Sequence, residues 1–236
     1  EKSIPQMFVT NIFNFASEGK RFRYGSINAP VSVWGPWHTP ENKSEGTLAD
    51  VQRSLTAMMK PEIIMDIFQF FTMFATDKKY RKYKIICRYQ QFEGANMIVE
   101  RVKAGYPKKG LIWHFQGSGK SLLMVFAAQK LRMTEELNNA TILIVLDRID
   151  LKNQIFATFS AADVPNLVIA EDKADLRSKL TGDVRKIIIT TVFLFDQIDS
   201  ALNMRDNIIL MVDEAHRTQE GNLGANMRRA LPNAFF

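Results

Sequence analysis

A chain of 236 residues is long enough for one large domain or about one and a half. Hydrophobic residues make up 46 % and charged residues 24 %, which excludes intrinsic disorder, collagen and coiled coil as descriptions of the whole chain. The net charge of +6 weakly favours a polyanionic partner.

The N-terminal segment, residues 4–26, carries strand signals on both sides of a turn at Gly19. It has no basic region followed by an apolar run, so we predict no signal peptide, and it begins without Met, as part of a longer protein would. The single cysteine, Cys87, allows no intramolecular disulfide, which favours a reducing cytoplasm.

Two helices are predicted next. Residues 47–60 place their apolar side chains on one helical face, and Thr47 with Asp50 resembles a capping box. Pro61 favours the start of a second helix, which we expect to reach about Ala75. This apolar stretch is too short to span about 30 Å of hydrocarbon, so we predict a buried helix and no membrane contact.

Residues 78–84 (KKYRKYK) form a strongly basic segment. It is interpreted either as a solvated linker or as a contact with phosphates. We place a domain boundary near 84–88, which divides the chain into 1–87 and 88–236.

The region 88–236 alternates short apolar strands with amphipathic helices, as a parallel sheet covered on both faces requires. The predicted strands are 110–115, 141–146, 166–170, 186–191 and 207–212. The predicted helices include 119–132, 150–159 and 173–180.

Between the predicted strand 110–115 and the next helix lies the segment QGSGKS. Glycines there let backbone N–H groups turn towards phosphate oxygens, and the helix N-terminus adds partial positive charge. Lys120 would reach the β and γ phosphates, and the Ser121 hydroxyl would bind Mg²⁺. The full phosphate-loop pattern has glycine where this chain has His114. The predicted nucleotide-binding residues are Gln116, Gly117, Ser118, Gly119, Lys120 and Ser121.

An acidic box, DEAH, follows the predicted strand 207–212. Carboxylates at the carboxyl end of a parallel strand face the ligand crevice. Asp213 would hold Mg²⁺, Glu214 would polarise the attacking water and His216 would lie near the γ phosphate. The alternative for the acidic pair is a helix cap.

Three weaker signals come from polar residues at element ends. Arg148 follows a strand and is expected to contact a phosphate backbone, or else belongs to an ordinary helix start. Hydroxyls of Thr190 and Thr191 can bond phosphate oxygens, although threonine is also a common strand residue. Gln91, near the start of a predicted helix, could contact the adenine edge or simply be a polar helix start.

Together these motifs resemble the R (motor) subunits of type I restriction enzymes, which are DEAH-box-like translocases of helicase superfamily 2. The segments that carry the resemblance are RYQQF (88–92), IWHFQGSGKS (112–121), LDRIDLKNQI (146–155), IIITT (187–191) and VDEAHRTQ (212–219). The resemblance is looser upstream, where residues 7–26 are similar to the end of the family's nuclease domain.

The resemblance implies an α/β chain. Residues 88–236 would form the first RecA-like P-loop domain, with a mainly parallel sheet flanked by helices and an incomplete C-terminal end. Residues 1–87 would be the C-terminal remnant of an α/β nuclease-like domain plus a linker.

The implied activity is that of a cytoplasmic, ATP- and Mg²⁺-dependent subunit that translocates double-stranded DNA and cuts it. Methyltransferase and specificity subunits would be its partners. By motif position, Lys120, Asp213, Glu214 and His216 would be catalytic, and Gln91 and residues 116–121 would bind ATP. Ser121 and Asp213 would hold Mg²⁺, and Arg148, Thr190 and Thr191 would contact DNA.

Two parts of the family pattern are not found. Residues 1–84 contain no Asp followed by Glu-x-Lys, the nuclease set, and no TGTP-like motif or arginine finger follows the acidic box. We therefore expect this chain alone to bind ATP without efficient turnover.

Two other functions stay open. One is another superfamily 2 motor, a DNA or RNA helicase or translocase, against which the nuclease-like segment argues. The other is a non-enzymatic module with a vestigial nucleotide site, against which the intact GSGKS and DEAH segments argue.

Overall fold

The computed structural model describes most of the chain, in nine stretches. These are residues 10–27, 29–41, 43–76, 82–115, 117–147, 149–162, 164–198, 200–213 and 222–236. The chain divides into two compact units, the first comprising Glu1–Gly94 with Ala161–Asp163 and the second Ala95–Ser160 with Val164–Phe236.

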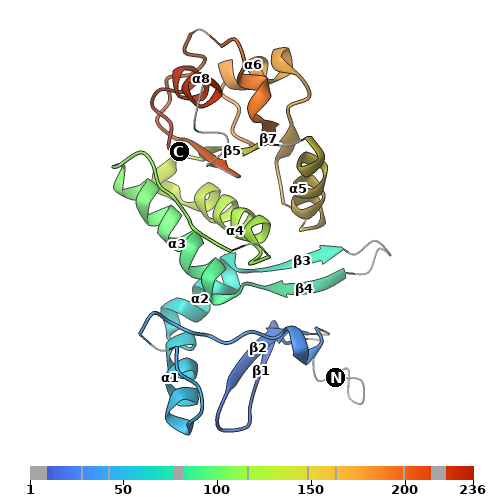
Figure 1. Cartoon of the computed structure of the whole chain (residues 1–236), viewed down its shortest axis with the longest axis vertical. Coiled ribbons are helices and arrows are strands. Elements are labelled where there is room, and N and C mark those ends of the chain that lie inside the picture. The colour runs from blue at the N-terminus through green and yellow to red at the C-terminus, as the bar shows by residue number, and fades with distance from the viewer. Residues whose placement is uncertain are drawn as a thin grey trace. The chain divides into compact units, whose positions relative to one another are not determined.

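The first unit begins with an antiparallel hairpin of β1 (Phe13–Ser17) and β2 (Phe22–Ser26), shown in Figure 1. Gly19 lies in the turn with φ +87°, a conformation that glycine adopts without steric cost. The hairpin and its turn are confirmed; the first described strand begins at Phe13, and residues 4–9 of the predicted segment lie outside the described residues. A short helical turn, η2 (Val31–Val33), follows.

Helices α1 (Leu48–Met58) and α2 (Pro61–Phe70) confirm the two predicted helix starts. Thr47 Oγ1 accepts from the Asp50 backbone N–H at 3.2 Å, and Asp50 Oδ2 accepts from the Thr47 N–H at 2.9 Å. This reciprocal pair is the predicted capping box, which satisfies two donors at the helix start.

The prediction that the second helix reaches about Ala75 is wrong. Helix α2 ends at Phe70, and β3 (Thr72–Thr76) pairs antiparallel with β4 (Lys82–Ile86). The alternating burial along β3 is typical of a strand with one covered face, which single-sequence periodicity did not distinguish from an apolar helix end. Part of the basic segment 78–84 thus lies in a strand rather than a linker, and residues 77–81 lie outside the described residues.

The Asp50 carboxylate makes the stability of this unit pH-dependent. Hydrogen bonds from the Thr47 and Ser44 side chains lower the pKa of Asp50 to about 2. A carboxyl group whose pKa falls on folding stabilises the fold above its unfolded pKa, and this contribution is lost as pH falls through the folded value. We expect the urea concentration at the unfolding midpoint to decrease as the pH is lowered from 4 to 2. The decrease should be smaller in Asp50→Asn. Glu62→Gln, an exposed carboxylate on α2, is the control and should keep the wild-type pH dependence.

The second unit contains a sheet of four parallel strands in the order β6-β7-β5-β8. The strands are β5 (Thr141–Leu146), β6 (Leu167–Ile169), β7 (Ile187–Thr191) and β8 (Ile208–Val212). Every residue of β5 and β7 is buried, as expected for central parallel strands covered on both faces.

Helices flank this sheet, as Figure 1 shows. Helix α4 (Lys120–Met133) packs against β5, and the opposite face carries a core to which α6 (Lys173–Thr181) and α8 (Asn222–Ala230) contribute. The remaining elements are η3 (Glu135–Leu137), α5 (Ile149–Ala161) and η4 (Val192–Phe195). The predicted α/β fold with a mainly parallel sheet flanked by helices is confirmed.

Helix α3 (Tyr89–Ala104) begins in the first unit and continues in the second. Its start at Tyr89 agrees with the helix predicted near Gln91. The last turn carries Arg101 and Lys103, where cations interact favourably with the helix dipole.

The predicted strand 110–115 does not form. The Gly110 N–H donates to the Phe236 carbonyl at 2.8 Å, but residues 111–115 lie in no strand. Their side chains are largely exposed, with Trp113 at 88 % and Phe115 at 70 %. An apolar run becomes a strand only beside another strand, and the sheets formed by the described residues do not include this segment.

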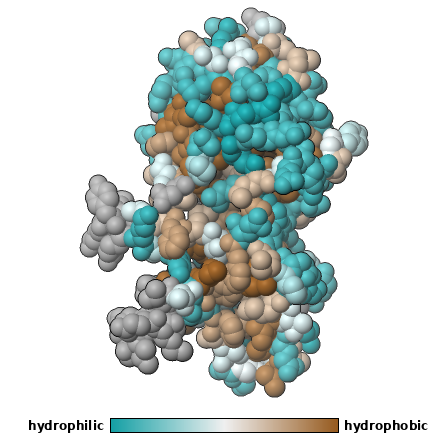
Figure 2. Space-filling view, turned by 180° about the vertical axis from the view of Figure 1, so that it is seen from behind, coloured by the Kyte–Doolittle hydropathy of each residue, from teal (hydrophilic) through white to brown (hydrophobic). Residues whose placement is uncertain are grey.

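The surface of the first unit carries hydrophobic side chains, visible in the space-filling view (Figure 2). Among the described residues Phe15, Val31 and Phe74 are more than half exposed there. In the same described part, no helix is long and apolar enough to cross a membrane.

Candidate nucleotide-binding site

The phosphate loop has the backbone that its sequence predicts. Gly117 and Gly119 both have positive φ, +81° and +87°, and Gly119 is the N-cap of α4. A Cβ built on Gly117 would meet no atom within 4 Å, so the space beside this glycine is open. The loop therefore ends at a helix N-terminus whose N–H groups and partial positive charge suit an anion.

Ser118 supplies an independent observation in the same loop. The residue is 5 % exposed, and its Oγ has no hydrogen-bond partner among the described residues. An unsatisfied buried hydroxyl costs free energy, and phosphate oxygens are suitable acceptors for it. Lys120 and Ser121 open α4 directly after the loop and are half-buried. These groups fit a nucleoside triphosphate with its Mg²⁺.

Other predicted residues meet at the carboxyl edge of the sheet. Asp213 directly follows β8, and its N–H donates to the Val145 carbonyl of β5 at 2.9 Å. On the other side of β5, Val145 lies opposite Thr190 and Leu146 opposite Thr191. The parallel register thus brings Asp213 and the two threonines to one edge, where ligands of open α/β sheets bind.

The threonines differ from Asp213 in exposure. Thr190 is fully buried, Thr191 is 4 % exposed, and Asp213 is half-buried. The Thr190 hydroxyl donates to the Thr191 carbonyl at 3.4 Å. Their proposed contact with DNA stays a prediction, and it requires a phosphate to approach hydroxyls that are covered in this structure.

Four predicted site residues lie outside the described residues. They are Gln116, Arg148, Glu214 and His216. Their roles therefore stay predictions from sequence. The described residues include no group of three or more His, Cys, Asp or Glu side chains that could hold a metal ion.

Gln91 lies in the first turn of α3 and is 2 % exposed. Its side-chain Oε1 accepts from the Arg88 backbone N–H at 2.9 Å, the N3 half of a capping box. Gln91 therefore caps the start of α3, in agreement with its interpretation as a polar residue at a helix start. The predicted contact of Gln91 with adenine stays a prediction.

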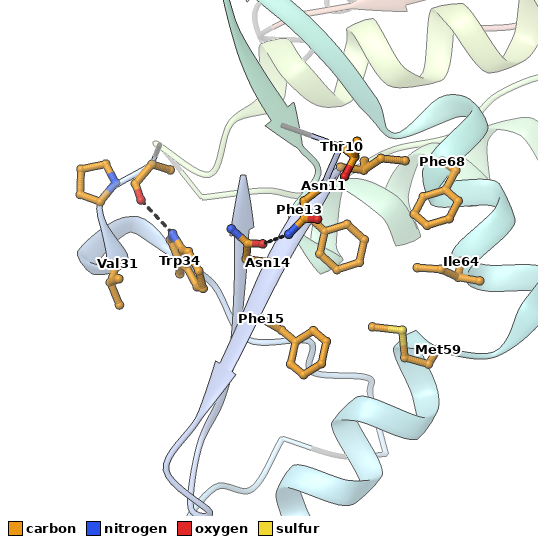
Figure 3. Close-up of a pocket in the computed structure, with 13 residues that line it drawn as sticks. Thr10, Asn11, Phe13, Asn14, Phe15, Val31, Trp34, Met59, Ile64 and Phe68 are labelled. Carbon is orange, nitrogen blue, oxygen red and sulfur yellow. Dashed lines mark hydrogen bonds between the residues drawn. The ribbon is translucent and has the colours of Figure 1, made fainter. Parts of the chain in front are cut away.

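The first unit contains a groove whose lining residues are not those of the predicted nucleotide site (Figure 3). Its volume is about 1170 Å³, and the residues drawn include Phe13, Trp34 and Phe68. None of its 13 lining residues is charged, and none belongs to the predicted site. The lining therefore offers no positive charge to a phosphate group.

The parallel sheet, the glycine loop before α4 and the aspartate after β8 define the class of RecA-like ATPase domains. In agreement with this class, residues 90–236 match the model of the SWI2/SNF2 ATPase family, and the chain belongs to this family.

Two curated relatives match almost the whole chain. It is 34 % identical over 99 % of its length to the type I restriction enzyme HindI endonuclease subunit of Haemophilus influenzae. It is 30 % identical over its full length to the putative type I restriction enzyme MjaIXP endonuclease subunit of Methanocaldococcus jannaschii. The chain spans about a quarter of the length of each. These matches confirm the resemblance to restriction-enzyme motor subunits.

The open space beside Gly117 leads to a prediction about the loop. Alanine at φ +81° costs about 1–2 kcal/mol, and its methyl group would fill the space through which phosphate approaches. We expect Gly117→Ala to lower the affinity for Mg-ATP at least tenfold, as measured by calorimetry. Gly105→Ala is the matched control, because Gly105 also has positive φ, +76°, and open space beside it. It should lose similar stability and keep its ATP affinity; an equal loss of affinity in both variants would contradict the prediction.

Proposed function

We propose that this chain is the ATP-binding motor part of a type I restriction enzyme endonuclease subunit that translocates double-stranded DNA. The observation that carries the proposal is the phosphate loop. Two positive-φ glycines and a buried, unsatisfied serine hydroxyl stand at the N-terminus of α4. The names of the relatives support the restriction system as its setting.

Each predicted site residue would have its own role in nucleotide binding. The backbone N–H groups of residues 116–121 and the Lys120 ammonium would bind the phosphates. Ser121 and Asp213 would hold Mg²⁺, which when bound neutralises charge on the β and γ phosphate oxygens. Gln91 would contact the adenine amino edge.

The hydrolytic roles follow from the acidic box. Glu214 would orient and polarise the attacking water, and His216 would lie near the γ phosphate. Transition-state charge on the phosphate also needs a positive group, which related motors take from another domain. We therefore propose that the 236-residue chain alone binds Mg-ATP but turns it over slowly.

DNA and protein partners complete the proposal. Arg148 with Thr190 and Thr191 would contact the DNA backbone, and the net charge of +6 suits a polyanion. Methyltransferase and specificity subunits would direct the motor to its DNA, and site-specific cleavage would use nuclease residues of the full-length subunit. The single cysteine, buried Cys87, is consistent with the cytoplasm of the host cell.

A triplex-displacement assay with the full-length subunit and its partners tests this function. Linear DNA would carry the recognition site and, far from it, a fluorescent third strand. We expect ATP-dependent displacement whose delay grows with the distance between the two. Site cleavage without any ATP-dependent displacement would contradict the motor proposal.

A further inference from the structure

The two-stranded sheet of β3 and β4, here named the β3–β4 ribbon, contains part of the basic segment to which the proposed function assigns no role (Figure 1). Residues 78–84 hold five Lys or Arg and no Asp or Glu, whereas the rest of residues 1–94 holds eight basic and nine acidic residues. Residues 77–81 lie outside the described residues, and β4 begins at Lys82. The positive charge of this part of the chain is therefore concentrated in a short stretch that includes the first three residues of β4.

One face of the β3–β4 ribbon is covered and the other is open. Met73 and Ala75 of β3 are buried, at 8 % and 3 % exposed. On the other face Phe74, which is 53 % exposed, lies opposite Lys84, and the exposed Lys82 is two positions away on the same strand. Because alternate residues of a strand share a face, the open face presents both lysines together with the phenylalanine ring.

Two contacts hold the Lys84 ammonium group at this open face. Its Nζ donates to the Asn11 carbonyl at 2.5 Å and lies 5.8 Å from the centre of the Phe74 ring. An aromatic ring attracts a cation through its quadrupole, without a charge of its own. Because the carbonyl and the ring are both uncharged, these two contacts fix the position of the ammonium group and leave its charge unchanged.

The shape of the β3–β4 ribbon favours duplex DNA over duplex RNA as the polyanion that it would bind. The major groove of B-form DNA admits a two-stranded β-ribbon, whereas the major groove of A-form RNA is too narrow for side chains to enter. Lysines of a ribbon in or beside such a groove can reach the flanking phosphates, and contacts with phosphates carry no base preference. The charge and the shape therefore indicate the same partner.

We propose that the open face of the β3–β4 ribbon is a binding surface for duplex DNA, on which Lys82 and Lys84 contact phosphates irrespective of base sequence. The choice of polyanion rests on the proposed function, in which the full-length subunit translocates double-stranded DNA. The proposal adds a DNA contact in the first unit, whereas Arg148, Thr190 and Thr191 belong to the second. This contact needs no nucleotide, because it uses no residue of the phosphate loop.

The test is the salt dependence of DNA binding by the 236-residue chain in the absence of nucleotide. The probe is a short fluorescent DNA duplex in two unrelated sequences, and anisotropy gives the dissociation constant at each salt concentration. Each phosphate contact contributes about 0.9 to the slope of log Kd against log salt concentration. We expect the double variant Lys82→Gln, Lys84→Gln to lower this slope by about 1.8 and to weaken binding to both sequences roughly tenfold at low salt.

Three comparisons make the result specific. The double variant Lys20→Gln, Lys43→Gln removes the same charge from two exposed lysines of the first unit outside the ribbon, and it should keep the wild-type slope. Lys82→Gln alone changes an exposed side chain and should lower the slope by about 0.9, which keeps the test valid should the ribbon double variant not fold. A duplex RNA of the same sequence should bind the wild-type chain more weakly than the DNA duplex does.

The outcomes separate this proposal from the proposed function. If the wild-type chain binds the DNA duplex and the ribbon variants keep the wild-type slope, the ribbon is not a DNA surface, and the DNA contacts proposed in the second unit stand. Equal losses in the control double variant would show an effect of net charge alone and overturn the proposal, as would equal affinity for duplex RNA. A lower slope in the ribbon variants, without ATP-dependent triplex displacement by the full-length complex, would support the ribbon and contradict the motor.

Discussion

Lys120→Ala is expected to abolish ATP-dependent translocation by the full-length subunit in its complex. Lys120 is the first residue of α4, directly after the positive-φ Gly119. Without its ammonium group the negative charge of the β and γ phosphates is not compensated, and loss of one such group lowers rates by roughly 100- to 1000-fold. The measurement is the rate of triplex displacement at saturating ATP.

Lys109→Ala serves as the control for charge alone. Lys109 is an exposed lysine of the same unit, and its replacement removes the same charge without touching the loop. Its displacement rate should stay within about twofold of wild type, since surface charges contribute little. Normal translocation by Lys120→Ala, with the variant folded, would show that the loop does not bind the phosphates as proposed.

Glu214→Gln is expected to separate binding from hydrolysis. Glutamine keeps the size and hydrogen-bonding reach of the side chain but is not a base, so the attacking water loses its polarising partner. General base catalysis contributes roughly 100- to 10,000-fold, and we expect ATP hydrolysis by the full-length complex to fall by that order. The affinity for Mg-ATP should change less than about threefold, because Asp213, rather than Glu214, is the proposed metal ligand.

The matched substitution is Glu171→Gln, the same change at a carboxylate that follows β6. The exposed Glu171 side chain forms an ion pair with Lys152, at 3.4 Å, and is not one of the predicted site residues, so hydrolysis should remain at the wild-type rate. Loss of ATP binding by folded Glu214→Gln would assign Glu214 to the metal or the phosphates instead.

Local signals predicted much of the fold. The β5, β7 and β8 strands are short, mainly apolar runs, and their alternation with helical segments predicted the parallel sheet. Thr47 and Asp50 predicted the start of α1 because a capping box joins the N-cap residue to the third helical residue, so that it can be found in a short stretch of sequence.

Long-range pairing was the source of the errors. Residues 111–115 have the composition of a strand, but strand formation depends on a neighbour that composition cannot reveal. The same holds for Thr72–Thr76, which became a strand through its pairing with β4.

The site was predicted where a motif carries the chemistry and missed where packing does. The glycines of the phosphate loop were identified from the sequence and have the positive φ that the motif requires. Nothing in the sequence relates the Asp213 N–H to the Val145 carbonyl, because their hydrogen bond exists only once β8 lies beside β5 in the parallel sheet.

Calorimetric titration of Mg-ATP into the folded 236-residue chain tests the central claim most directly. The account predicts saturable binding of one nucleotide per chain, lost when Lys120 is replaced by alanine. Absence of binding to the folded chain, and again to the full-length subunit, would contradict it and identify a vestigial nucleotide site.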